Sequence, residues 1–470
     1  MAASAAKRRT LWEELILKIT LNTKHVLMRE ELHSSIGLYS PSFLKMHIDV
    51  NEYLDDIFEI SPLASAAYIH EYVHFLQDIT TVYGQKNIIS VVDYIKSVNF
   101  NQRNAEERIL SIPYIPEEKR DPGAYYNGEL QKIHIGTIRG DGINTISEIN
   151  KEIVQAILID KKIDVEIVKL VVTIGQPPKE HIYQFGSHAI IESMAFAIEQ
   201  SIYPGIVEEP NDFCYRAASE IIHFCYPELM RDPLNVIALC DASLMYFNPA
   251  AIFYNTLLKM KDIGYIPTSA FDIYRFVHSH IEIEFWGLTQ IDQIFNNHTL
   301  TALSQLNDYF TTDLFAPNRV WIDYTFRKAN EIRSKDWGFF IKLASDGPIK
   351  NNPTFKKIFA SIGIPLVTNR TGNAVFASPV EDETVVRPDI LWAINQIYNI
   401  YINSAKSQIR RCGMEDWCRA SCLNSNTEDY TDYRCIESPW ERVKDKDNLC
   451  VFSQIWRTWG MENEIPTIKR

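Results

Sequence analysis

The sequence lacks any hydrophobic run near the ~18 residues of a membrane span, and its mean hydropathy is −0.16. Basic residues are also in deficit, because 47 Lys and Arg stand against 60 Asp and Glu, for a formal net charge of −13. This charge disfavours polyanions, so we expect neither nucleic acid nor a membrane as a partner. The chain has no internal repeat and no long low-complexity tract.

No secretory signal is expected at residues 1–21, since Glu13, Glu14 and Lys18 interrupt the segment 11–21 where an uncharged core is required. The eight cysteines are not spread like a disulfide framework, because five of them crowd into residues 412–450. We therefore expect a cytoplasmic protein. Its 470 residues, 46% hydrophobic and 23% charged, indicate a globular chain of two or three domains. The sequence carries no indication of oligomeric state.

The fold class predicted from these patterns is α+β and mostly α-helical, with a small β-sheet. Residues 129–138 alternate apolar and polar side chains, and residues 165–174 are rich in β-branched ones, so both are predicted strands. Either could offer an edge to an extended peptide, or the two could form an internal hairpin.

Three regions follow from the composition along the chain. Residues 1–205 contain the predicted sheet and the motifs described below, and residues 206–345 are predicted to be helical. Prolines and glycines in residues 346–390 are typical of a loop or linker. A helix near 389–411 is then expected to lead into the cysteine-rich tail.

The clearest helix signal runs from Ser61 to Gly84. Ser61 is a good N-cap, Pro62 suits the first helical position and Gly84 is a natural stop. Between them the only formal charges are Glu71 and Asp78. A helix with so few charges is predicted to be buried, and its polar side chains then need partners inside the protein.

This helix contains the motif HExxH, written His70-Glu71-Tyr72-Val73-His74. At 3.6 residues per turn both imidazoles lie on one face, where they can hold one Zn²⁺, and Glu71 can reach a water on that ion. The alternative is a pair of hydrogen-bonded core histidines. The nearly uncharged helix around the motif favours the metal.

A second buried helix is predicted over residues 188–200. Gly186 and Ser187 precede it, and the turn Tyr203-Pro204-Gly205 ends it. Its two formal charges, Glu192 and Glu199, are both acidic.

The HExxH helix resembles that of the zincin metallopeptidases, over about 20 residues and with the second helix as a further point of similarity. The resemblance implies a zincin-like catalytic region in which His70 and His74 bind zinc and Glu71 activates the zinc-bound water for attack on a peptide carbonyl. It implies a protein or peptide as substrate.

Zincins differ in their third ligand. The metzincin continuation is excluded, because Gln77 and Thr80 stand where Gly and His are required. The gluzincin pattern ExxA matches Glu192-Ser193-Met194-Ala195, so the resemblance implies Glu192 as the third ligand. Glu199, His188 and Asp78 are the alternatives.

Four further residues are candidates for supporting roles. Asp78 lies one turn after His74 and His188 one turn before Glu192, so either could orient a ligand by a hydrogen bond. His181 and Tyr183 precede the second helix and are candidate donors to the developing oxyanion. Asp78 could equally be a carboxylate at the helix end without a role at the metal.

The tail offers a candidate second metal site formed by Cys412, Cys418, Cys422 and Cys435, with Cys450 as a fifth thiol. No histidine follows His298, so such a site would be all-thiolate. A structural Zn²⁺, an iron–sulfur cluster and free or redox-active thiols all remain open. The function predicted for the whole chain is a zinc metallopeptidase, and the alternative is a non-catalytic metal-binding interaction protein or redox sensor.

Overall fold

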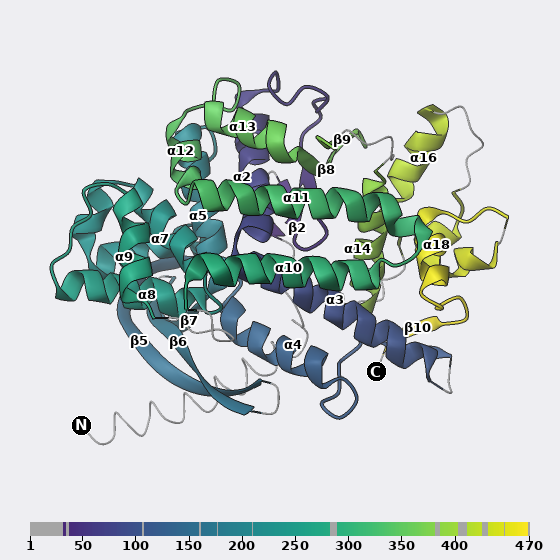
Figure 1. Ribbon diagram of the computed structural model, residues 1–470, viewed down its shortest axis with the longest axis horizontal. Helices are drawn as coiled ribbons and strands as arrows, with labels where there is room; N and C mark the ends of the chain where they lie inside the picture. The colour runs from purple at the N-terminus through teal and green to yellow at the C-terminus, as the bar shows by residue number, and fades with distance from the viewer. Residues whose placement is uncertain are drawn as a thin grey trace.

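The computed structural model describes the chain in segments (Figure 1), namely residues 32–33, 37–105, 108–158, 161–175, 177–208, 210–282, 289–380, 386–402, 411–424, 431–445 and 447–468. The protein is mixed α/β, with helices making up more than half of it and the strands gathered in small sheets. This confirms the expected mixture of many helices with little sheet.

Helix α2 (Pro62–Thr80) lies at the centre of the molecule and carries the HExxH motif. It begins as predicted, because the Ser61 hydroxyl accepts a hydrogen bond from the backbone N–H of Ala64 at 3.3 Å and Pro62 occupies the first turn. Every side chain from Ala64 to Thr80 is buried. A helix enclosed on all sides can afford few charges, and this explains its composition.

The predicted stop at Gly84 is wrong. Helix α2 ends at Thr80, and α3 (Val82–Arg103) starts after the single residue Thr81. A Cβ on Gly84 would lie 2.3 Å from the Gln77 carbonyl oxygen. The glycine therefore lets the first turn of α3 pack against the last turn of α2, and it ends neither helix.

Helix α2 contacts α3, α5 (Ser187–Ile202) and α11 (Ala316–Lys335). The bounds of α5 confirm the second predicted helix. Figure 1 shows α11 crossing in front of α2, with α5 beside it. These contacts place the acidic α5 next to the HExxH motif.

Strands β2 (Gly37–Ser40) and β3 (Lys45–Ile48) also pack on α2 and belong to a sheet of order β1-β2-β3-β8-β9. The other members are β1 (Leu32–His33), β8 (Ile364–Asn369) and β9 (Ala374–Ala377). Strand β3 pairs with β8 in parallel, Lys45 opposite Leu366.

The loop or linker expected within residues 346–390 is therefore wrong over much of its length. It contains helix α13 (Pro353–Ile362) as well as β8 and β9. Pro353 occupies the first turn of α13, a position where proline favours a helix rather than breaking it. All six residues of β8 are buried.

A second sheet has the order β5-β6-β7, formed by β5 (Ile143–Leu158), β6 (Lys161–Ile174) and β7 (Lys179–Phe185). The predicted strand 165–174 is confirmed inside β6. The predicted strand 129–138 is wrong, because helix α4 (Pro122–Ile135) covers most of it. Residues 130, 131, 134 and 135 are buried, which is a helical and not an alternating pattern.

Helices dominate the rest of the chain, and the short strand β10 (Ile465–Ile468) pairs in parallel with β4 (Ile109–Ile112). The remaining α-helices are α6 (Ala217–Cys225), α7 (Leu234–Leu244), α8 (Pro249–Asp262), α9 (Phe271–His280), α10 (Ile291–Tyr309), α12 (Phe339–Ser345), α14 (Pro388–Ile402), α16 (Glu415–Asn424), α17 (Arg434–Glu437) and α18 (Val451–Thr458). The 3₁₀ turns are η2 (Phe213–Tyr215), η3 (Pro227–Arg231), η4 (Asp313–Phe315) and η5 (Pro439–Lys444).

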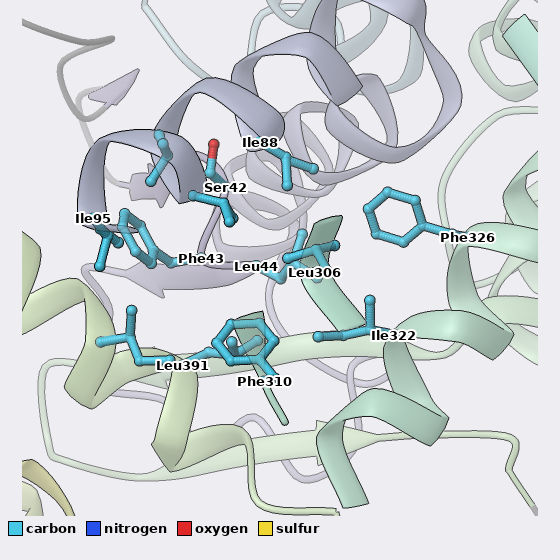
Figure 2. Close-up of a pocket in the computed structure, with 13 residues that line it drawn as sticks. Ser42, Phe43, Leu44, Ile88, Ile95, Leu306, Phe310, Ile322, Phe326 and Leu391 are labelled. Carbon is cyan, nitrogen blue, oxygen red and sulfur yellow. The ribbon is translucent and has the colours of Figure 1, made fainter. Parts of the chain in front are cut away.

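A small apolar cavity lies where α3, α10, α11 and α14 meet the turn at residues 42–44 (Figure 2). Its volume is about 20 Å³, room for about one water molecule. Its lining is aliphatic and aromatic apart from Ser42. A space this small and this apolar is a packing feature of the core and not a ligand site.

The C-terminal end of α2 is held by Arg333 of α11. Its Nε donates to the Thr80 carbonyl oxygen at 3.1 Å, and its two terminal nitrogens donate to the carboxylate of Asp241 on α7 at 2.7 and 2.8 Å. Asp241 also accepts from the Tyr274 hydroxyl at 2.6 Å. Both charged side chains are fully buried. Each charge is therefore tolerated only because the other is present.

We predict that Arg333→Met destabilises the protein by about 3–5 kcal/mol, because it leaves the Asp241 carboxylate buried without its cation. Urea unfolding measures the change. Arg327→Met is the matched control on the same helix, since Arg327 pairs with Asp323 in a largely exposed bridge. That change is expected to cost less than about 1 kcal/mol. Equal effects of the two variants would contradict the role given to Arg333.

Candidate metal centre

Helices α2 and α5 bring His70, His74 and Glu192 together in the core. The two histidines lie one turn apart, with their ring centroids 4.9 Å from each other, and Glu192 faces them from α5. None of the three residues is more than 1% exposed. Their donor atoms all lie within 4.8 Å of one another, and no other group of His, Cys, Asp or Glu does so in the described part of the chain.

The spacing of these donors fits a tetrahedral ion. The Nε2 atoms of His70 and His74 each lie 3.4 Å from the same Glu192 oxygen, Oε2. Bonds of about 2.0–2.1 Å to a tetrahedral zinc place its ligands about 3.3–3.4 Å apart. The donor set of two imidazoles and one carboxylate is also one that zinc accepts. The residues present therefore fit the metal that the sequence motif predicts.

Hydrogen bonds fix the ring orientation of both histidines. His70 Nδ1 lies 2.8 Å from Glu199 Oε2, and His74 Nδ1 lies 2.9 Å from Gln77 Oε1. The Gln77 amide nitrogen donates to the Ile191 carbonyl oxygen at 3.2 Å, so its oxygen faces His74 as an acceptor. The proton of a neutral His74 is then on Nδ1, and the Nε2 lone pair points toward Glu192.

The carboxylates bias the charge of the site. Burial lowers the pKa of His70, but its hydrogen bonds to Glu192 and Glu199 outweigh this and bring the pKa well above its ordinary value. Burial also lowers the pKa of His74, and Glu192 offsets this only in part. Burial alone would raise the pKa of Glu192, yet the two histidines leave it below its ordinary value. The meeting point of the Nε2 atoms therefore attracts positive charge, which a proton on His70 or a bound cation supplies.

Glu71 is fully buried and lies against strand β2. A Cβ on Gly37 would come within 2.4 Å of Glu71 Oε1, so only a glycine lets the β2 backbone approach the carboxylate this closely. The charge of Glu71 acts on His70 and on Tyr215 of η2. The carboxylate therefore lies beside the predicted ligands and is not one of them.

The two predicted orienting residues, Asp78 and His188, act on different ligands. Asp78 Oδ2 accepts from the Tyr39 hydroxyl at 3.0 Å and from the Ser42 N–H at 2.9 Å, and the Tyr39 ring stacks on His74 at 6.2 Å. Asp78 thus supports His74 through Tyr39. His188 is buried on α5, one turn before Glu192, and its charge lowers the pKa of Glu192.

Of the two predicted oxyanion donors, His181 is exposed on β7, whereas Tyr183 is buried. The charge of Glu192 contributes to raising the pKa of Tyr183. The Tyr183 hydroxyl has no hydrogen-bond partner in the described structure. Tyr215 lies closer to the histidines, with its ring centroid 5.9 Å from that of His70. Of these three, Tyr183 and Tyr215 face the site.

The sequence alone does not indicate the roles that Glu199, Gln77, Gly37 and Tyr215 have in the structure. Glu199 had been an alternative third ligand, and the structure instead places it on the far nitrogen of His70. The spacing of three residues between His74 and Gln77 on one helix could have indicated their contact. Nothing in the local sequence connects Gly37 or Tyr215 to the motif.

The tail thiols form a looser group. The charges of Cys450, Cys418 and Cys435 add to burial in raising the pKa of Cys412, so these four thiols are neighbours. The Cys412 N–H also donates to the Cys435 carbonyl oxygen at 2.7 Å. Cys450 therefore lies beside three of the four predicted thiols. The sulfur atoms are more widely spaced than the donors at His70, and the second metal site stays a prediction.

Comparison of the chain with protein-family models, curated proteins and solved structures finds no match. Among the described residues, no helix is both long and apolar enough to cross a membrane. A function for this chain therefore has to be inferred from the geometry of the site.

We predict that zinc displaces about one proton when it binds the metal-free protein at pH 7, because the ion and the proton compete for His70. Apparent zinc affinity should accordingly rise with pH. Calorimetric titration with zinc in two buffers of different ionisation enthalpy counts the protons released. A count near zero would show that His70 does not exchange a proton for the metal.

Proposed function

We propose that the protein is a zinc-dependent metallopeptidase, zincin-like with a glutamate as third ligand, which hydrolyses peptide bonds of a cytoplasmic protein or peptide. The observation that supports this best is the convergence of His70 Nε2 and His74 Nε2 on Glu192 Oε2, each 3.4 Å from it, with Glu71 beside them. In this proposal residues 1–205 contain the catalytic region, completed by strand β8 from the third region.

The ligand set suits a hydrolytic ion. Two neutral imidazoles and one carboxylate leave a divalent ion with one net positive charge, and three protein ligands leave a fourth position open. When bound, the ion supplies Lewis-acid chemistry, which acidifies water and polarises a peptide carbonyl.

Glu71 is the general base in this proposal. Its carboxylate follows a ligand directly in sequence and is held against the backbone of β2. It accepts a proton from the attacking water and passes that proton to the leaving amine. Glu199 and Gln77 keep the two imidazoles in the orientation that ligation requires.

The developing negative charge on the substrate oxygen needs a donor besides the metal. Tyr183 and Tyr215 are the candidates. Both side chains are buried, and the charge of Glu192 contributes to raising the pKa of both hydroxyls. Because the ligands and Glu71 are enclosed, a peptide reaches them only if the surrounding chain rearranges.

We predict that Glu71→Gln retains zinc and lowers the rate of peptide cleavage by about 100-fold or more, because the amide cannot accept the proton. His74→Ala, by contrast, should lose the metal. Elemental analysis gives the zinc content. A proteome-wide search for new N-termini, made with wild type and Glu71→Gln, identifies the substrate and the bond.

Cleavage that is unaffected in Glu71→Gln would overturn the proposed mechanism. Zinc that is retained by wild type and lost in His74→Ala, with no cleavage by either, would instead support the non-catalytic metal-binding alternative.

The contact between Gly37 and Glu71 gives a second test. Gly37→Ala forces the carboxylate or strand β2 to shift, and a displacement of this size is expected to slow cleavage by about 100-fold with zinc content unchanged. Gly123→Ala on α4 is the matched control, because no atom lies within 4 Å of its Cβ position. Full activity in Gly37→Ala would show that the position of Glu71 does not limit the reaction.

A further inference from the structure

Lys86 lies in a cluster of aromatic and imidazole side chains away from the candidate metal centre. Its Nζ is 3.0 Å from Nδ1 of His134 on α4. The rings of Tyr83 and Phe247 flank the amine, with centroids 5.8 and 6.0 Å away. The ring of His298 on α10 packs edge-on against Phe247 at 5.0 Å. The Lys86 side chain is half-buried.

The cluster provides no counter-ion for a lysine. In the described part of the chain no carboxylate contacts Lys86, and the groups that face it from α3, α4 and α10 are Tyr83, His134 and His298. Cation–π contact with two rings is worth about 1–2 kcal/mol at best, whereas a buried ammonium without a carboxylate costs several times more. The surroundings therefore disfavour the charged amine relative to that of an exposed lysine.

The titration of the neighbouring groups agrees with this. Burial lowers the pKa of Lys86 to about 7. Burial and the charge of Lys86 lower the pKa of His134 well below its ordinary value, and that of His298 to about 4. Both histidines are then neutral at pH 7, and His134 Nδ1 can accept a hydrogen bond from the amine.

We propose that Lys86 is a nucleophilic amine that captures small uncharged aldehydes or ketones as an imine. The amine nitrogen attacks the carbonyl carbon while His134 accepts a hydrogen bond from the amine, and a solvent water relays a proton from the nitrogen to the oxygen. Water then leaves as the carbon–nitrogen double bond forms, so that amine and carbonyl compound give imine and water. The aromatic walls and the lack of charge favour an apolar carbonyl compound over an anionic one. This inference is independent of the proposed peptidase activity.

Reductive trapping tests the proposal. The full-length protein is treated with propionaldehyde and cyanoborohydride at pH 6–10, and the modified lysines are quantified by peptide mass spectrometry. At pH 7 we expect Lys86 to react at least about tenfold faster than Lys132, which lies on α4 and is paired with Glu129 at 2.6 Å. The ratio should fall as the pH rises toward 10, because the neutral fraction of an ordinary lysine grows in this range while Lys86 is already neutral. A ratio near one at pH 7 would overturn the proposal.

A pair of variants separates reactivity from structure. His134→Glu places a carboxylate beside the amine, so Lys86 should stay charged and lose its advantage over Lys132 at pH 7. His134→Gln offers a neutral acceptor and should keep most of that advantage. Loss of the advantage in both variants, with folding intact by circular dichroism, would show that charge does not govern the reaction, which contradicts the inference.

Discussion

Charge compensation between α2 and α5 is the constraint on which the rest of the site depends. Neither helix contains lysine or arginine, yet their residues Glu71, Glu192 and Glu199 are all buried. Buried carboxylates are tolerated when hydrogen bonds or positive charge face them. The imidazoles of His70 and His74 meet this need, and both converge on Glu192. Metal affinity and the packing of the two helices are therefore coupled in one set of contacts.

The surrounding chain holds α2, and with it the contact between α2 and α5, in place from several directions. Arg333 fixes the end of α2, Gly84 brings α3 close to it, and Asp78 connects it to the strands through Tyr39. These groups come from distant parts of the sequence, and all of them act on the last two turns of α2. The ligand His74 lies in this part of the helix, so its position depends on the tertiary structure.

The sequence was informative where a local pattern determines the structure. The N-cap at Ser61, the spacing of His70 and His74 and the acidic face of α5 follow from helix geometry and from burial, and the structure has all three. Residues 129–138 were misassigned because a short stretch of a helix can also show alternating apolar and polar side chains. Most of this stretch belongs to α4. Residues 353–377 were misassigned because proline at a helix start resembles proline in a linker. Gly37 and Tyr215 reach the site only through tertiary packing, for which a single sequence has no local signal.

The pairing of β3 with β8 has a consequence for how the protein is made. Lys45 finds its partner, Leu366, only after most of the chain has left the ribosome. Until then the sheet beside α2 lacks strands β8 and β9, and the apolar surface of the helix is incompletely covered. Nascent chains are therefore expected to depend on chaperones during synthesis, and the metal-binding residues to reach their final arrangement late in folding.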